Sequence, residues 1–249
     1  MTKLFATLSA EGLEEAGDRL GGANEPLPTN VYAGTVKVAY AGASAGGAQN
    51  VSLVLDVGGR EVRETVYITS KKGENFYVDK KDPTKKLPLP GYTTIDDLCL
   101  LATGEPLTEQ ATEEKVIKIY NFDQRKEVPT PVQVLGALTD KPVLVGILRE
   151  ISDKEKKNDA GAYVKTGETR TLNVIDKFFH PETKRTVAEY RHEVTTADFH
   201  DAWVQRNAGK DRDKSTKTSG VGASGTGRPA IFGAAAGGVA KPKSNLFSK

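Results

Sequence analysis

Three alternating segments, two of them joined by a pair of glycines, constrain the fold more than any other feature of the chain. Segment 51–57 carries an apolar side chain at every second position, and segment 60–68 follows directly after Gly58 and Gly59. Period-two alternation is typical of half-buried β-strands, and consecutive glycines tolerate the positive φ angles of a tight hairpin turn. Segment 31–41 also alternates, and one of its sides is expected to carry Tyr32, Val36, Val38 and Tyr40. These patterns predict a β-meander.

The remaining segments predict more strands and a few helices. The run 141–150 is apolar on both faces, which is typical of a central strand, whereas 151–167 is charged and is expected to be a loop. Further strands are expected at 75–79, 115–122, 170–176 and 186–193, the last two as a pair. Helices are expected at 9–20, at 93–104 with acidic residues in the first turn, and from Asp198 onward with Trp203 as a packing anchor.

Composition and charge separate a folded part from a tail. Hydrophobic residues make up 37% of the 249 residues, which is enough for a core, but the chain from Asn207 onward is rich in Gly, Ala, Ser and Lys. This tail has a net charge of +6, which leaves −4 for the rest of the chain. Because the tail has few large apolar residues, it is predicted to be disordered. We therefore expect one domain over residues 1–206 and a disordered basic tail over residues 207–249.

Targeting signals are not recognisable in the sequence. No uninterrupted apolar run is long enough to cross a bilayer, and the first residues lack the basic-then-apolar pattern of a signal peptide. We therefore expect a cytoplasmic protein without membrane attachment. The single cysteine, Cys99, excludes an intrachain disulfide and lies in an apolar segment that favours a buried thiol.

Patterns that carry catalytic chemistry are weak. The glycine-rich stretch 42–47 precedes a strand rather than the helix that a phosphate-binding loop requires. The histidines His180, His192 and His200 lack the spacing of a zinc site, and no compact set of carboxylates indicates a two-metal nuclease. We expect no enzymatic activity, no metal and no cofactor, and we keep a nuclease as a third hypothesis.

Lysines and aromatic residues are concentrated between residues 66 and 92. Binding a single nucleic-acid strand needs cations that follow the phosphates and flat rings on which bases stack, at about 1–3 kcal/mol per base. Segment 115–122 repeats this combination on a second predicted strand. The candidate nucleic-acid-binding residues are Tyr67, Lys71, Lys72, Tyr77, Lys80, Lys81, Lys85, Lys86, Tyr92, Lys118, Tyr120 and Phe122.

These residues also have an ordinary structural interpretation. Lysine-rich hairpins are commonly solvated loops or guarded sheet edges, and Phe76 and Phe122 are the aromatic residues most expected in the core. Two strand segments with tyrosine beside lysine favour binding, because a five-stranded Greek-key barrel of the OB type presents such strands to nucleic acid. The competing hypothesis is a protein-interaction or virion-associated module whose lysines are solvated and bind no nucleic acid.

Several short runs give the chain a resemblance to a known family. They are Tyr32-Ala33-Gly34-Thr35-Val36, Ser44-Ala45-Gly46-Gly47-Ala48, Val66-Tyr67-Ile68-Thr69-Ser70 before Lys71-Lys72-Gly73, and Leu89-Pro90-Gly91-Tyr92. In this order they resemble single-stranded DNA-binding proteins of tailed bacteriophages, particularly the N4-like podoviruses, over most of residues 1–206. The resemblance implies an OB-type fold, mainly β with a few helices and an elaborated periphery. It also implies sequence-tolerant binding of single-stranded DNA without catalysis, in phage DNA replication, recombination and repair within the host cell cytoplasm.

The tail departs from this family pattern. Single-stranded DNA-binding proteins often end in an acidic tail with an aromatic tip, whereas this tail has a charge of +6. An acidic tail that competes with DNA is therefore not expected. Three alternatives remain: added nonspecific DNA affinity, apolar hooks at 231–232 and 246–247 for phage or host replication and transcription proteins, or an inert solubilising segment.

Overall fold

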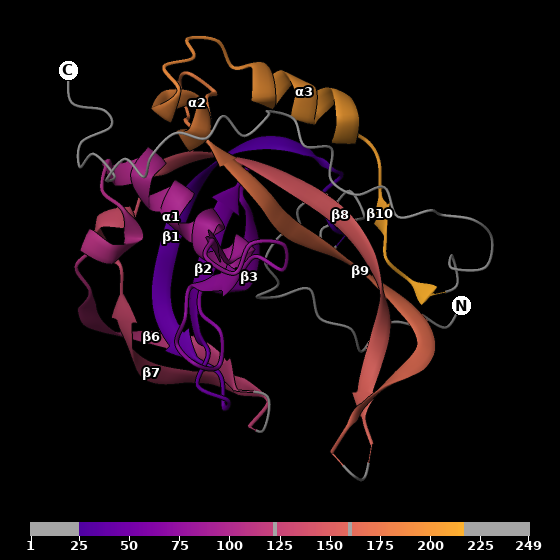
Figure 1. The fold of residues 1–249 in the computed structure, drawn as a ribbon. Helices are drawn as coiled ribbons and strands as arrows, with labels where there is room; N and C mark the ends of the chain where they lie inside the picture. The colour runs from indigo at the N-terminus through magenta and orange to yellow at the C-terminus, as the bar shows by residue number, and fades with distance from the viewer. Residues whose placement is uncertain (1–24, 122–123, 159–160, 217–249) are drawn as a thin grey trace, which may run out of the picture.

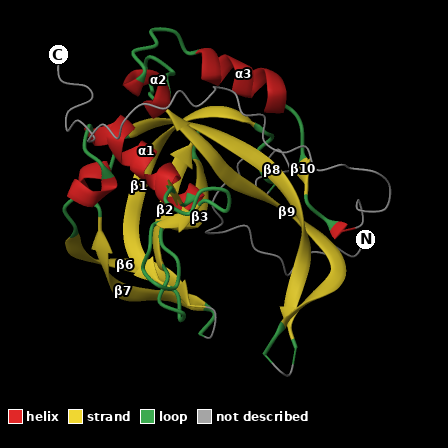
Figure 2. Ribbon diagram, in the orientation of Figure 1, coloured by secondary structure: helices red, strands yellow, loops and turns green. Residues whose placement is uncertain are grey.

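The computed structural model describes residues 25–121, 124–158 and 161–216 of the chain. Within these residues an eight-stranded sheet and a two-stranded sheet are accompanied by three α-helices (Figures 1 and 2). The expected class, mainly β with a few helices, is therefore confirmed. The expected N-terminal helix, Phe122 and the tail from residue 217 onward lie outside the described residues.

The elements follow one another along the chain in a β-rich order. The strands of the large sheet are β1 (Asn30–Ala43), β2 (Gln49–Val57), β3 (Arg60–Tyr67), β6 (Glu113–Asn121), β7 (Lys126–Val134), β8 (Pro142–Lys157), β9 (Tyr163–Phe179) and β10 (Arg212–Asp213). The small sheet consists of β4 (Phe76–Val78) and β5 (Lys86–Pro88). The helices are α1 (Pro90–Thr103), α2 (Val187–Arg191) and α3 (Asp198–Asn207), with short 3-10 turns at Leu107–Glu109 and Gly136–Leu138.

The first three strands form the predicted meander. Strand β2 pairs antiparallel with β1 on one edge and with β3 on the other. The turn between β2 and β3 has φ angles of 59° at Gly58 and 82° at Gly59, in the left-handed region that glycine tolerates. Alternate residues of β2 from Val51 to Val57 are buried, and helix α1 contributes Ile95 to the same core.

One expectation for β1 is wrong because the strand contains a β-bulge. The register of β1 against β2 shifts between Val36 and Val38, which inserts Lys37 as an extra residue. Side chains after a bulge change face relative to those before it. Val36 and Ala39 are fully buried, whereas Val38 and Tyr40 lie on the outer face and not beside Val36 as the alternation predicted.

Strand β8 is the central strand that its two apolar faces predicted. It pairs antiparallel with β1 and β9 and, near its middle, parallel with β10. The resulting order β9-β8-β1-β2-β3 curls so that β3 and β9 come into contact (Figure 1). At this seam the Glu64 carboxylate on β3 accepts a hydrogen bond from the backbone N–H of Ile175 on β9.

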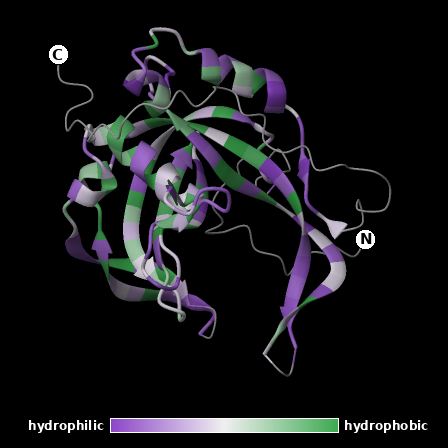
Figure 3. Cartoon of the chain, in the orientation of Figure 1, coloured by the Kyte–Doolittle hydropathy of each residue, from purple (hydrophilic) through white to green (hydrophobic). Residues whose placement is uncertain are grey.

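The charged segment after the core of β8 is a long hairpin and not the loop that the sequence predicted. Strands β8 and β9 remain paired as far as Lys157 and Tyr163. Cross-strand ion pairs such as Lys154 with Glu168, at 3.0 Å, stabilise the pairing where the hairpin has no apolar core. Figure 3 shows the hydrophilic character of this distal part.

The expected strand pair of 170–176 with 186–193 is wrong in its second member. Residues 170–176 belong to β9, but their partner is β8. The second segment starts helix α2 because Thr186 and Glu189 form a capping box. The Thr186 hydroxyl accepts from the Glu189 N–H at 3.2 Å, and the Glu189 carboxylate accepts from the Thr186 N–H at 2.7 Å.

Between β3 and α1 the chain forms the part that we call the lysine hairpin, residues 70–89. The strand expected at 75–79 is present as β4, and it pairs with β5, which the sequence did not predict. Helix α1 begins at Pro90, three residues earlier than expected, and has no acidic residue in its first turn. Its expected end is confirmed by Gly104, which has a φ of 81°.

The folded part continues past residue 206, where the sequence predicted the tail to begin. After α3, strand β10 pairs with β8, and Arg212 donates to the Glu150 carboxylate at 2.8 Å. Thr216 hydrogen-bonds to Asp153 at the base of the β8–β9 hairpin. Residues 207–216 are therefore part of the domain, because charged side chains and backbone pairing hold them to β8.

Trp203 is a packing anchor, as predicted. It is 5% exposed, lies edge-on against Phe179 and donates its indole N–H to Asp176 at 2.8 Å. Gly146 on β8 makes room for the indole, because a Cβ there would lie 3.0 Å from the ring. Helix α3 is thereby fixed to the central strand.

Replacing Trp203 with alanine should lower the free energy of unfolding by about 3–5 kcal/mol, because it leaves a cavity between α3 and β8. Urea unfolding would measure this loss. Trp203→Phe, which keeps an aromatic ring in the site, should lose markedly less. Equal stability of the alanine variant and the wild type would show that α3 contributes nothing to the fold.

Glu64 at the β3–β9 seam is a partly buried acid with an unusual pKa. Burial raises its pKa to about 7, and the neighbouring carboxylates Glu150 and Asp176 add to the rise. The hydrogen bond from Ile175 and the charge of Arg212 act in the opposite direction. The carboxyl group is therefore protonated in much of the folded protein near neutral pH.

The raised pKa makes the stability of the protein depend on pH. Between the ordinary value of 4.5 and the folded value of about 7, the folded state binds more protons than the unfolded state. Stability therefore falls as the pH rises through this window. We expect the free energy of unfolding of the wild type, relative to Glu64→Gln, to fall by roughly 1–3 kcal/mol from pH 4.5 to pH 7.5. Urea unfolding across this range would measure it, and a constant difference would contradict the prediction.

Candidate nucleic-acid interface

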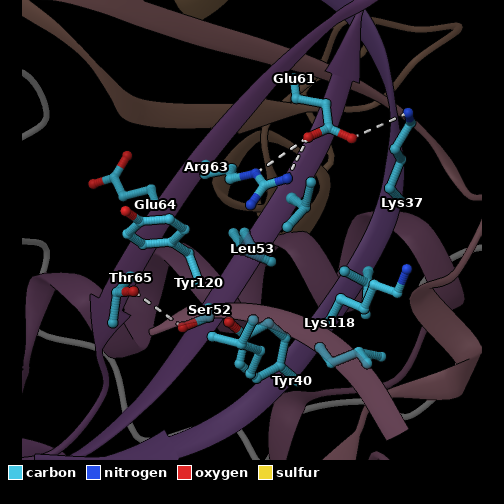
Figure 4. Close-up of a pocket in the computed structure, with 14 residues that line it drawn as sticks. Lys37, Tyr40, Ser52, Leu53, Glu61, Arg63, Glu64, Thr65, Lys118 and Tyr120 are labelled. Carbon is cyan, nitrogen blue, oxygen red and sulfur yellow. Dashed lines mark hydrogen bonds and ion pairs between the residues drawn. The ribbon is translucent and has the colours of Figure 1, made fainter. Parts of the chain in front are cut away.

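A cleft lies between the outer face of the meander β1–β2–β3 and strand β6, which runs across that face (Figure 4). Its volume is about 370 Å³. Figure 4 shows Lys118 of β6 beside Tyr40 of β1, and Tyr120 of β6 beside Thr65 of β3. The cleft therefore combines side chains from strands that are far apart in the sequence.

Proline residues explain why β6 and β7 leave the sheet. Strand β7 pairs with β6 over its whole length, but in the described part of the chain it pairs with β1 only through Gln133 and Val134. Pro129 and Pro131 have no N–H group, so β7 cannot form a continuous ladder on both of its edges. The β6–β7 hairpin is consequently free to lie over the meander and form one wall of the cleft.

Two tyrosine rings and a polar floor form one end of the cleft. Tyr120 is 44% exposed, and Tyr40 is half-buried. Beside them the hydroxyl groups of Ser52 and Thr65 lie 3.0 Å apart in a hydrogen bond (Figure 4). Exposed aromatic faces next to hydroxyl groups can stack on flat apolar groups and hydrogen-bond their polar edges.

The other end of the cleft carries charged groups that are paired with one another. The Glu61 carboxylate accepts hydrogen bonds from Arg63, at 2.6 Å, and from Lys37, at 3.3 Å. These bonds, that from Arg63 first, hold the pKa of Glu61 below its usual value, and the bond to Glu61 raises the pKa of Arg63. The cleft thus contains two cations that are paired with carboxylates of the protein itself, and Glu61 is common to both pairs.

The structure brings only some of the predicted site residues to this cleft. Lys118 and Tyr120 line it, and Tyr67 lies two residues beyond Thr65 on the same outward side of β3. Tyr67 is 51% exposed. The aliphatic part of Lys71 lies over Gly46 in the turn between β1 and β2. The outward side chains of β3 therefore lead from the cleft toward the lysine hairpin.

The other predicted cations lie on the lysine hairpin and do not line the cleft. Tyr77 is 48% exposed on β4, and Lys86 lies 4.3 Å above the ring of Phe76. Lys85 is paired with Asp82 at 3.5 Å. The other exposed lysines of this hairpin are Lys71, Lys72, Lys80 and Lys81.

One of the predicted aromatic residues, Tyr92, is not an exposed stacking surface. Tyr92 on α1 is half-buried, and its pKa is raised by burial and by the nearby Asp96, against a hydrogen bond with Asn75. This environment indicates a structural role for the ring. Phe122 lies outside the described residues.

Sequence reasoning missed three residues of the cleft, Lys37, Tyr40 and Arg63. The bulge conceals Tyr40, because simple alternation assigns it to the same side of β1 as the buried Val36. Alternation in 60–68 puts Arg63 on the side of β3 opposite Val62, but no neighbouring aromatic residue in the sequence marked it as a site. The β8–β9 hairpin also presents an exposed tyrosine beside a lysine, with Lys157 5.8 Å from the ring of Tyr163.

The described residues contain no group of His, Cys, Asp and Glu side chains arranged to hold a metal ion. Cys99 is buried in the core, and burial raises the pKa of its thiol far above the usual range, so the thiol is unreactive at neutral pH. None of the described helices is both long enough and apolar enough to span a bilayer.

The chain was compared with models of protein families and with curated proteins. No protein-family model matches the chain, and no curated protein matches its sequence.

Proposed function

We propose that the protein binds single-stranded DNA without sequence specificity and that the cleft is the centre of its binding surface. The observation that carries the proposal is the cleft itself, where Tyr40, Tyr120, Lys118 and Arg63 line one surface over the face of β1–β3. Rings and cations on one surface are what an unpaired strand requires, since bases stack on the rings and phosphates contact the cations.

We further propose that the fold is of the OB type. Strand order supports this: a meander β1–β2–β3 is followed by α1, then β8 pairs with β1 and β9 pairs with β8. A five-stranded, partly open Greek-key barrel has this arrangement and binds oligonucleotides on the face of its second and third strands. On this proposal, the β6–β7 hairpin is an insertion that covers the binding face.

The biological setting follows from the sequence resemblance and is proposed with it. The protein would coat single-stranded DNA during phage DNA replication, recombination and repair in the host cell cytoplasm, without catalysis or a cofactor. The tail would supply contacts to phage or host replication and transcription proteins. A protein-interaction or virion-associated module is the alternative, in which the exposed lysines are only solvated.

Stacking on Tyr120 can be tested with an oligo(dT) titration followed by tyrosine fluorescence. Tyr120→Ala should weaken binding by roughly 5- to 100-fold, because stacking contributes about 1–3 kcal/mol per base. Tyr120→Phe keeps the ring and should retain most of the affinity. Binding of duplex DNA should be much weaker. No binding of oligo(dT) by the full chain would overturn the proposed function.

Salt dependence tests whether the lysine hairpin extends the interface. If Lys80 and Lys81 contact phosphates, Lys80→Ala/Lys81→Ala should reduce the slope of log K against log[salt] by about 1.4, at about 0.7 per phosphate contact. The control is Lys184→Ala/Arg206→Ala, which removes two charges near α2 and α3 and should leave the slope unchanged. Equal slopes for both variants and the wild type would confine the interface to the cleft.

A further inference from the structure

The charged end of the cleft is built around one carboxylate shared by two cations. Glu61 contacts Arg63 through the guanidinium Nε at 3.1 Å and Nη2 at 2.6 Å, and contacts the Lys37 ammonium at 3.3 Å (Figure 4). The same ammonium lies 3.6 Å from Asp56. Lys37, Glu61 and Arg63 line the cleft that the proposed function assigns to DNA.

The sheet geometry brings these groups together. Glu61 and Arg63 are two residues apart on β3, so their side chains emerge on the same face. Asp56 lies directly opposite Glu61 in the β2–β3 ladder. Lys37, the extra residue of the bulge in β1, extends its side chain to both Asp56 and Glu61. The arrangement therefore follows from the backbone register and from the single extra residue in β1.

A carboxylate and a phosphate can each bind to such a pair of cations. Both are planar or tetrahedral anions whose oxygens accept charge-assisted hydrogen bonds from guanidinium and ammonium groups. The side chains of Lys37, Arg63 and Glu61 are 45%, 57% and 40% exposed, so all three can be reached by an anion from solvent. Exposed ion pairs of this kind are weak, so an incoming phosphate can replace the carboxylate.

We propose that Lys37 and Arg63 form a phosphodiester subsite of the cleft and that Glu61 is its built-in competitor, which occupies both cations until a phosphate displaces it. This inference rests on the proposed function. It names two contact residues absent from the lysine-rich segment and explains why a cleft with paired charges can still bind a polyanion. The internal carboxylate lowers the affinity and so favours release of the strand.

Neutralising Glu61 provides the test. Glu61→Gln keeps the size of the side chain, frees Arg63 for phosphate and leaves Lys37 with Asp56 as its remaining acidic partner. In oligo(dT) titrations of the full chain at low salt, binding should tighten by about 3- to 10-fold, as expected for the loss of two exposed ion pairs. The slope of log K against log[salt] should become steeper by about 0.7 for each cation released.

A matched control separates this local effect from a change in net charge. Glu105→Gln removes the same charge from an exposed position that does not line the cleft, and it should leave affinity and slope within error of the wild type. Arg63→Gln alone should weaken binding. In the Arg63→Gln background, Glu61→Gln should give much less than its full gain, because one of the two cations is missing. Unchanged thermal unfolding would show that the variants are folded.

The outcomes distinguish the two proposals. If the wild type does not bind oligo(dT), the proposed function fails. If the wild type binds but Glu61→Gln behaves like Glu105→Gln, the built-in competitor is overturned and the proposed function stands. If Glu61→Gln gains the same factor with and without Arg63→Gln, its effect does not pass through the guanidinium, and the assignment of Arg63 to the subsite is overturned.

Discussion

The bulge at Lys37 is the constraint on which the curved sheet and its outer cleft both depend. Strand β1 pairs with β8 through its first residues and with β2 through its later ones, and the bulge lies where the partners change. A bulge bends a strand and increases its local twist. The same extra residue turns Val38 and Tyr40 to the outer face, so that one local feature shapes both the core and the cleft.

The curled sheet is held together by side-chain contacts at its seam, where, within the residues that the structure describes, β3 and β9 meet without pairing through their backbones. Glu64 links β3 to the N–H of Ile175, and Arg212 links β10 to Glu150 on the neighbouring strand. Carboxylates and cations are therefore grouped at the seam, where burial of Glu64 makes its protonation part of the folding equilibrium. The residues after α3 belong to this charged seam, which explains why the domain extends beyond the expected boundary at residue 206.

The lysine hairpin and the charged end of the cleft present their cations differently. The lysine hairpin presents exposed ammonium groups, whereas Lys37 and Arg63 are held by Glu61. In the proposed interface, the exposed lysines of the hairpin would attract a polyanion to the periphery, whereas at Lys37 and Arg63 a phosphate would have to replace the Glu61 carboxylate. The proposed binding and release of a polyanion rest on this distribution of charge.

The sequence by itself determined the elements whose patterns are local. Alternation placed β2, β3 and β6, two glycines fixed the β2–β3 turn, and the apolar run at 141–150 identified the central strand. It also named Lys118 and Tyr120 of β6 as candidate binding residues. Tertiary structure alone decided the rest. The β1 bulge, the continuation of β8 and β9 as a charged hairpin, the helix at Thr186 and the meeting of β6 with Arg63 depend on pairing between distant segments. A periodic pattern reports which side chains share a face, but it carries no information about the strand that will lie opposite.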